Sequence, residues 1–161
     1  MSNISASHIL NDKDIWFTDI YIENFPENSP ERKLMEIFAY GTLNYYESIR
    51  KDLPKEYQFE SDSIALNKLK SLTILTIMQD KIEYSFNKLK EDLNIDNTIS
   101  AENLILDLMG AGLYTGKIDE LNGTFTCERV ASRCVPNNQE NITEIINDLK
   151  EFQSKIKNVI Q

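Results

Sequence analysis

Few residues of this chain are of a type and spacing that could do chemistry. Its 161 residues include a single histidine, His8, and two cysteines, Cys127 and Cys134. Zinc sites use several Cys or His ligands at short spacings, and the seven-residue separation of these cysteines fits neither such a site nor a redox pair. Nucleophilic and acid–base catalysis need a reactive side chain beside a second group that activates it. The sequence therefore predicts no catalytic residue, no metal site and no cofactor.

The remaining candidates have simpler interpretations. His8 lies in a terminal segment that we expect to be frayed, so a solvated side chain is favoured over a general base. Cys127 is expected on the inner side of a hairpin, as a small buried hydrophobe. Gly110-Ala111-Gly112 comes late in a helical pattern, where glycine commonly ends a helix, and no phosphate-binding helix follows it. These residues favour a binding or scaffold protein over an enzyme.

Charge and hydropathy narrow the set of partners. The chain carries 17 Lys and Arg against 26 Asp and Glu, for a formal charge of −9, and 41% of its residues are hydrophobic. Binding to a nucleic-acid backbone requires clustered basic residues, so this balance argues against nucleic acid. No apolar run approaches the ~20 residues of a membrane span, and the N-terminus lacks the basic start and apolar core of a signal peptide. We expect one globular domain, or one domain with appended helices, and no membrane partner.

The N-terminal segment is predicted to form short helices. Apolar residues recur at helical spacing over 15–21, and Ser29-Pro30 is a helix start, with serine as the cap and proline at the first helical position. Gly41 indicates a break before the next helix, and residues 54–62 are predicted to be a polar loop. The aromatic residues of this segment are interpreted as core.

The middle segment carries signals for three helices. The first begins near Ser63, and its apolar residues run along one face. Each of the next two starts with an apolar residue, a serine cap and a leucine four positions beyond the cap: Tyr84-Ser85 with Leu89, and Ile99-Ser100 with Leu104. This arrangement is the hydrophobic staple, in which the two apolar side chains meet across the start of the helix. The sequence therefore predicts helices over 86–93 and 101–113.

A β-hairpin is predicted after the third helix. Asn122-Gly123 is the strongest two-residue turn signal, because both positions need positive φ angles. Counting outward from that turn gives three pairs: Ile118 with Cys127, Glu120 with Phe125, and Lys117 with Glu128. The first two pairs share one face, on which the apolar residues point inward. Lys117 and Glu128 form an opposite-charge pair on the other face, where they are candidate partner-binding residues.

A long helix is predicted at the C-terminal end. Val135-Pro136 stops the last strand, and Asn137 with Glu140 resembles a capping box. Apolar residues then recur at spacings of 3, 4, 3, 4 and 3 residues: Ile142, Ile145, Leu149, Phe152, Ile156 and Val159. This narrow row is typical of a helix that pairs with other helices. Four of its members are candidate partner-binding residues: Leu149, Phe152, Ile156 and Val159.

Three helices followed by a hairpin give the element order of a winged helix. The predicted fold is mainly α, with short helices in residues 1–62, the winged helix in 63–135 and a bundling helix in 136–161. Winged helices often bind DNA through the third helix. Here that helix carries Glu102 and Asp107 and no Lys or Arg, so it would repel phosphates. A winged helix that binds protein is therefore favoured over one that binds nucleic acid.

Three stretches of the chain resemble the PCI-domain family, the scaffold module shared by the proteasome lid, the COP9 signalosome and translation initiation factor 3. They are Leu34–Thr42, Asn67–Ile74 and Gly116–Asn122. The first two are similar to the subunit 7 branch of the COP9 signalosome, and the third is shared more loosely by many PCI domains. The likeness covers about residues 9–160, and the order of short helices, winged helix and long terminal helix agrees with it.

The resemblance implies a scaffold subunit without catalytic activity of its own. PCI subunits join through their winged helices and gather their terminal helices in a bundle. The implied partners are therefore other PCI and signalosome subunits, in a hetero-oligomeric complex of the nucleus and cytoplasm. That complex removes Nedd8 from cullin-RING ubiquitin ligases by zinc isopeptidase chemistry in another subunit. Two alternatives stay open: a PCI subunit of translation initiation factor 3 or the proteasome lid, and a winged-helix nucleic-acid binder.

Overall fold

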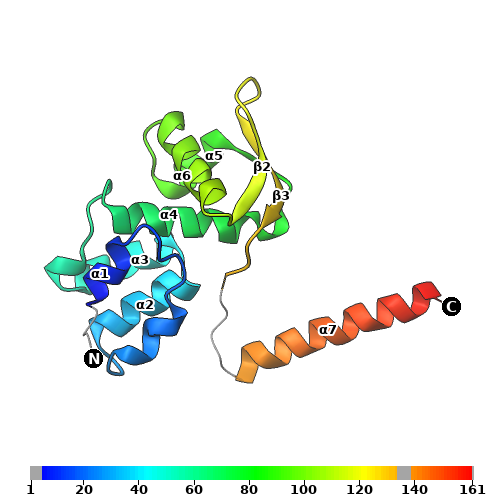
Figure 1. Ribbon diagram of the computed structural model, residues 1–161, viewed down its shortest axis with the longest axis horizontal. Helices are drawn as coiled ribbons and strands as arrows, with labels where there is room; N and C mark the ends of the chain where they lie inside the picture. Colours follow the sequence, from blue (N-terminus) through cyan, green and yellow to red (C-terminus); the bar gives the residue numbers. More distant parts are fainter. Residues whose placement is uncertain (1–4, 134–138, 161) are drawn as a thin grey trace.

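The computed structural model describes residues 5–133 and 139–160, and within the last helix the side chains of 143, 144 and 146–157. Figure 1 shows the helices, the short 3-10 turns (η) and the strands along the chain. They are α1 (Ala6–Asn11), η1 (Asp19–Asn24), α2 (Pro30–Tyr40), α3 (Leu43–Ile49), η2 (Arg50–Asp52), η3 (Lys55–Tyr57), α4 (Ile64–Ile77), η4 (Met78–Asp80), β1 (Glu83–Ser85), α5 (Phe86–Leu93), α6 (Thr98–Gly110), β2 (Tyr114–Asp119), β3 (Thr124–Val130) and α7 (Gln139–Ile160). Cys134, Val135-Pro136 and the cap at Asn137 lie outside the described residues, but β3 already ends at Val130, so the prediction that the last strand runs to Val135-Pro136 is wrong.

Serine caps start three helices where the sequence predicts them. The hydroxyl of each cap accepts a backbone N–H three residues on: Ser29 from Arg32 at 3.2 Å, Ser63 from Leu66 at 3.2 Å, and Ser85 from Lys88 at 3.5 Å. The first of these helices, α2, has Pro30 in its first turn and ends at Gly41 as predicted. Each cap satisfies an N–H that would otherwise lack a partner at the start of its helix.

The N-terminal segment contains a helix that the sequence did not indicate. Residues 6–11 form α1, capped by the Ser5 hydroxyl, with Ile9 and Leu10 fully buried. The predicted frayed terminus is therefore wrong for this stretch, although His8 itself is exposed on α1. The helical spacing over 15–21 is also only partly realised, because residues 15–18 form no helix and the 3-10 turn η1 begins at Asp19.

Residues 54–62 are a second correction, since they contribute to the core instead of forming a polar loop. Tyr57 and Phe59 are buried, and the Phe59 ring stacks on Tyr46 with the ring centroids 5.9 Å apart. The Tyr46 hydroxyl donates a hydrogen bond to the Tyr57 carbonyl at 2.7 Å and accepts one from the Phe59 N–H at 2.8 Å. A single buried hydroxyl thus satisfies two backbone groups of a segment that has no sheet partner.

Elements α4 to β3 form the predicted winged helix, with one strand more than expected. The sheet is antiparallel, in the order β1-β3-β2, and β1 pairs with β3 through Tyr84 opposite Phe125. At three residues, β1 is too short for a period-two pattern to be visible in the sequence. The fold class is confirmed: the chain is mainly helical, with short helices, a winged helix and a long terminal helix.

The start of α6 differs from the predicted one. Asn97 caps the helix by accepting the Ser100 N–H at 2.8 Å, so α6 begins at Thr98 and Ile99 is 70% exposed instead of stapled to Leu104. At its other end the helix stops at Gly110, before the predicted 113, and Gly112 adopts a φ of 75°. A left-handed residue there lets the following N–H groups return to the last carbonyls of the helix, which is the glycine stop the sequence suggested.

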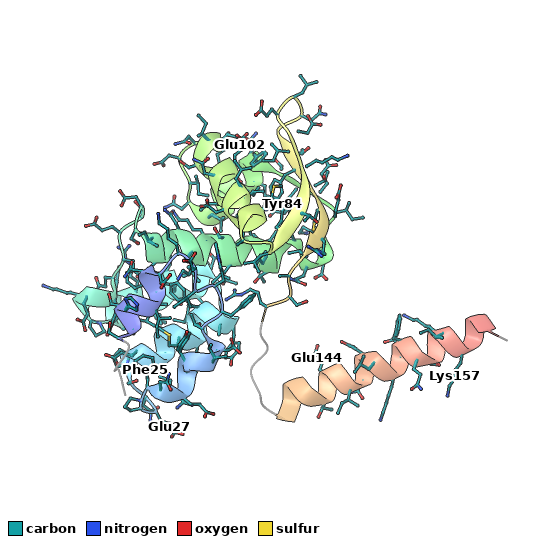
Figure 2. The ribbon with its side chains drawn as sticks, viewed as in Figure 1. Phe25, Glu27, Tyr84, Glu102, Glu144 and Lys157 are labelled. Carbon is teal, nitrogen blue, oxygen red and sulfur yellow. The ribbon has the colours of Figure 1, made fainter. Side chains whose placement is uncertain are left out.

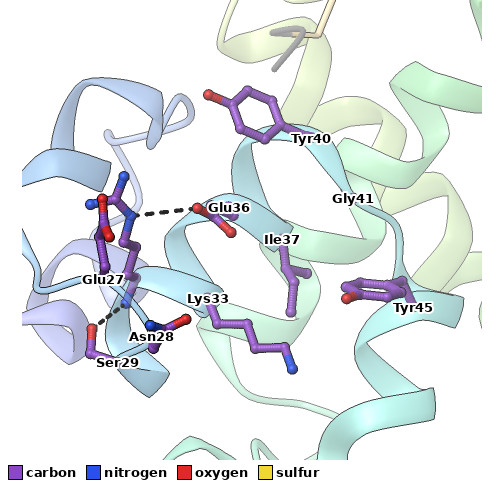
Figure 3. Close-up of a pocket in the computed structure, with 10 residues that line it drawn as sticks. Glu27, Asn28, Ser29, Lys33, Glu36, Ile37, Tyr40, Gly41 and Tyr45 are labelled. Carbon is purple, nitrogen blue, oxygen red and sulfur yellow. Dashed lines mark hydrogen bonds and ion pairs between the residues drawn. The ribbon is translucent and has the colours of Figure 1, made fainter. Parts of the chain in front are cut away.

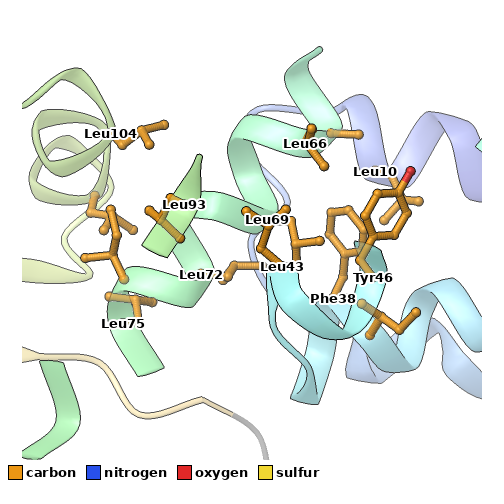
Figure 4. Packing of buried hydrophobic residues seen from close by; sticks show 14 of the residues in the cluster. Leu10, Phe38, Leu43, Tyr46, Leu66, Leu69, Leu72, Leu75, Leu93 and Leu104 are labelled. Carbon is orange, nitrogen blue, oxygen red and sulfur yellow. The ribbon is translucent and has the colours of Figure 1, made fainter. Parts of the chain in front are cut away.

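Helix α4 lies at the centre of the core. Buried leucines of α4 have the N-terminal helices on one side, with Phe38 and Tyr46, and α5 and α6 on the other, with Leu93 and Leu104 (Figure 4). Nearly every residue from Ala65 to Leu75 is buried. One continuous hydrophobic cluster therefore joins the short helices to the winged helix.

Candidate functional site

Helix α7 presents an apolar stripe, which we define as Ile146, Leu149, Phe152 and Ile156. Their exposed fractions are 45%, 63%, 63% and 43%. Figures 1 and 2 show α7 apart from the rest of the molecule, with its side chains projecting away from the ribbon. Of the four candidate residues on this helix, Leu149, Phe152 and Ile156 are thus exposed, and the side chain of Val159 lies outside the described residues. An exposed apolar stripe on a helix is typical of a surface that contacts another protein.

The predicted pairing of Lys117 with Glu128 on the hairpin is wrong. Lys117 lies opposite Thr126, Ile118 opposite Phe125 and Gly116 opposite Cys127, so the register is shifted by two positions. The turn has four residues between Asp119 and Thr124, because the Asp119 carboxylate accepts hydrogen bonds from both the backbone and the side chain of Asn122. A shift of two keeps Ile118, Phe125 and Cys127 on their predicted face, so Phe125 is buried and Cys127 is half-buried against the core, whereas Glu120 falls in the turn and is exposed.

Glu128 instead lies at an irregularity of the ladder between Thr115 and Gly116. A Cβ atom on Gly116 would lie 1.8 Å from the Thr126 carbonyl oxygen, which also accepts a hydrogen bond from the Tyr114 hydroxyl. Only glycine permits that close approach of the two strands. Lys117 and Glu128 are both exposed but do not face each other, so they offer two separate charges to a partner.

The outer face of α6 is acidic and apolar. Ile99 is 70% exposed and Leu106 51% exposed, while Asp107 is exposed and Glu102 half-buried. Helix α6 contains no Lys or Arg. Because negative charge and apolar surface both oppose contact with phosphates, this face is better suited to a protein partner than to DNA.

Arg133 follows the end of β3, and its side chain turns toward the N-terminal helices. Its guanidinium donates hydrogen bonds to the Phe38 carbonyl at 2.6 Å and to the Gly41 carbonyl, and to the Thr76 hydroxyl at 3.2 Å. These carbonyls belong to the end of α2, where helix carbonyls lack partners and a cation is favourable. Nothing in the local sequence signals this contact, because its partners lie more than 50 residues away.

Lys68 is a buried polar residue that sequence reasoning missed. It is only 4% exposed, and its Nζ donates to the carbonyls of Ile9 at 3.1 Å and Asp12 at 2.5 Å, at the end of α1. Burial lowers the pKa of Lys68 to about 8, and the nearby charge of Asp12 opposes that shift. A lysine with a lowered pKa can act as a nucleophile. Here the ammonium instead holds α1 against α4 through its hydrogen bonds to the two carbonyls.

An open groove of about 650 Å³ runs beside α2 (Figure 3). Its lining mixes both charges with two aromatic rings, including Lys33, Tyr40 and Tyr45, and Arg32 pairs with Glu36 at 3.5 Å. Within the described ranges, no group of three or more His, Cys, Asp or Glu side chains could hold a metal ion. Across those same residues, no helix is both long and apolar enough to span a bilayer.

Short helices, a three-stranded winged helix and a separate terminal helix are the elements of a winged-helix, PCI-like fold. Comparison with curated proteins agrees. The chain is 33% identical over 101 residues to COP9 signalosome complex subunit 7 of Arabidopsis thaliana, which covers 62% of this chain and 37% of that protein. It is 28% identical over 121 residues to the same subunit of Dictyostelium discoideum, covering 75% and 44%.

A third relative is eukaryotic translation initiation factor 3 subunit M of Coccidioides immitis (strain RS), with 28% identity over 145 residues that cover 86% of this chain and 30% of that protein. The chain thus spans less than half the length of each of these relatives. No protein-family model matches the chain. The resemblance to PCI-domain proteins that the three sequence stretches suggest is confirmed, and it includes COP9 signalosome subunit 7.

Proposed function

We propose that this chain is a non-catalytic scaffold subunit of a COP9 signalosome. The observation that carries the proposal is the exposed apolar stripe on α7, presented by a protein that resembles signalosome subunit 7. In such a complex the winged helix contacts neighbouring PCI subunits, and the stripe packs among their terminal helices. Burial of Leu149 and Phe152 there contributes about 1.5–3 kcal/mol each to assembly.

The chain would act by holding other subunits in place. Removal of Nedd8 from cullin-RING ubiquitin ligases would take place at a zinc isopeptidase site in a different subunit, in the nucleus and cytoplasm. The acidic and apolar outer face of α6 and the exposed charges Lys117 and Glu128 would contact protein surfaces. This arrangement accounts for the lack of basic residues on the third helix of a winged helix.

A second candidate is a scaffold subunit of translation initiation factor 3. The observation in its favour is the length of the alignment to subunit M of that factor, 145 residues against 101 and 121 for the two signalosome relatives. The same surfaces would then contact initiation-factor subunits. Nothing in the fold separates the two complexes, so the identity of the co-purifying subunits decides between them.

Affinity purification of the tagged chain from cells of its source organism tests the proposal. Signalosome subunits should co-purify with the wild-type chain, and Leu149→Asp with Phe152→Asp should abolish their recovery. The matched control carries Asn147→Asp and Ser154→Asp, which add the same charge to exposed positions of α7 outside the stripe and should leave recovery unchanged. Recovery of initiation-factor subunits would favour the second candidate, and recovery of nucleic acid alone would contradict both.

A further inference from the structure

The charges of α7 divide along its length in a way that suits pairing with a copy of itself. The first half of the helix holds the acidic residues Glu140, Glu144 and Asp148, and the second half holds Lys150, Lys155 and Lys157 with one acidic residue, Glu151. This polarity also complements the helix macrodipole. It has a second consequence, because two such helices placed antiparallel bring the acidic half of each beside the basic half of the other.

Two of these charges border the apolar seam directly. With Leu149 and Phe152 in the seam, Asp148 and Lys155 occupy the same flanking position one heptad apart, on one side of it. Both side chains are exposed, and the intrahelical ion pair of Lys155 with Glu151, at 3.2 Å, is between groups 72% and 67% exposed. Such an exposed pair exchanges easily for another one.

We propose that two copies of the chain associate through α7 as an antiparallel pair, with Leu149 of one copy opposite Phe152 of the other. In an antiparallel pair the flanking positions on one side of the seam face their own counterparts. Asp148 of each copy therefore faces Lys155 of the other, and the two-fold symmetry makes this contact twice. The same register pairs sequence position 145 with 156 and position 142 with 159, so the whole predicted apolar row is used.

A parallel pair lacks these contacts. In a parallel pair, the residue that flanks one side of the seam on one helix faces the residue that flanks the other side on its partner. Asp148 would then face Gln153, and no opposite charges would meet. Each Phe152 would also lie against another Phe152 and each Leu149 against another Leu149, whereas the antiparallel register matches a large side chain with a smaller one. Charge complementarity and packing thus select the same orientation.

The association does not depend on the proposed scaffold function, since it needs only the chain itself. It would cover the stripe assigned above to other subunits, so the self-paired form and the assembled form exclude each other.

Sedimentation equilibrium of the purified 161-residue chain tests the pairing. We expect a reversible monomer–dimer equilibrium. Asp148→Lys alone and Lys155→Asp alone each replace two attractive contacts by two repulsive ones, so each should raise the dimer Kd by about tenfold. The double variant should recover the wild-type Kd. A mixture of the two single variants should form heterodimers as strong as the wild-type dimer, which only the antiparallel register explains.

Matched controls change the same charges away from the seam. Glu144→Lys and Lys150→Asp lie on exposed positions of α7 that do not border it and should leave the Kd unchanged, with circular dichroism verifying equal helix content. A chain that is monomeric at every concentration overturns the proposal. A dimer that is insensitive to both single charge reversals, or single variants that do not rescue each other, overturns it equally.

Discussion

Helices α4 and α7 differ in the burial of their side chains: most of those on α4 are buried, and those of the apolar stripe on α7 are exposed. On α4, several polar side chains are buried, and they form hydrogen bonds within the chain: Lys68 at the end of α1, Lys70 at the Ser61 carbonyl and Thr73 at the Leu43 N–H. Along α7, the apolar stripe is exposed. The difference teaches that the body of the molecule buries its own side chains, whereas the apolar stripe of α7 stays exposed, as the proposed docking with a second molecule requires.

The largest expected effect is a cavity beside the centre of α4. Leu69 is fully buried, so Leu69→Ala removes its packing and should lower the free energy of unfolding by about 3 kcal/mol. Urea denaturation followed by circular dichroism measures this loss. A change below about 1 kcal/mol would show that α4 is not the shared core of the two sides.

The second prediction concerns the close approach of β2 and β3 at Gly116. Gly116→Ala should lower the free energy of unfolding by about 2–3 kcal/mol, because the new Cβ would meet the Thr126 carbonyl at 1.8 Å and force the strands apart. Gly110→Ala is the control: nothing lies within 4 Å of a Cβ there, so it should be neutral or slightly stabilising. Thermal melting of both variants decides the matter, and equal melting temperatures would contradict this hairpin register.

The buried lysine predicts how stability depends on pH. The folded pKa of Lys68 is about 8, below the ordinary 10.5, so between these values the unfolded chain holds a proton that the folded chain has released. The free energy of unfolding should therefore rise by about 1–2 kcal/mol between pH 8 and 9.5. Lys68→Met should reduce this slope. It should not abolish it, because burial lowers the pKa of Lys70 in the same direction.

Urea denaturation at each pH provides the measurement. The range stops below pH 10, since burial and the carboxyl of Glu31 raise the pKa of Tyr57 to about 12 and act in the opposite sense at higher pH. Identical slopes for the wild type and Lys68→Met would show that Lys68 is not buried as a charged group.

The smallest effect is expected on α7, and it completes the comparison. Leu149→Ala truncates the same type of side chain as Leu69→Ala, but at a site 63% exposed. It should change the free energy of unfolding of the dilute, monomeric chain by less than about 0.5 kcal/mol. A loss similar to that of Leu69→Ala would mean that α7 packs on its own body and that the stripe is core.

Local sequence patterns predict much of this fold. The serine caps of α2, α4 and α5 mark helix starts because a side-chain oxygen three residues before an N–H suffices to satisfy it. The row of apolar residues on α7 is likewise predicted from their recurrence every three or four positions. The faces of the hairpin follow from alternation, which tolerates a register shift of two.

The features that the sequence did not predict depend on contacts with residues outside the local pattern. The Asn122-Gly123 signal predicts a two-residue turn, but the Asp119 carboxylate binds Asn122 and opens the loop to four residues. Tyr57 and Phe59 are buried because Tyr46 satisfies their backbone from another element. For the candidate site, spacing alone identifies Leu149 and Phe152, whereas the outward position of Ile99 depends on Asn97, instead of the predicted Ser100, capping α6.

Arg133 gives the molecule a mechanical anchor. It lies three residues after the end of β3, and its guanidinium donates hydrogen bonds to the Phe38 and Gly41 carbonyls at the end of α2. Tension applied to the chain at this residue would be a load on the end of β3. The hydrogen bonds pass it into α2 and, through Thr76, into α4 before it can peel β3 from the sheet.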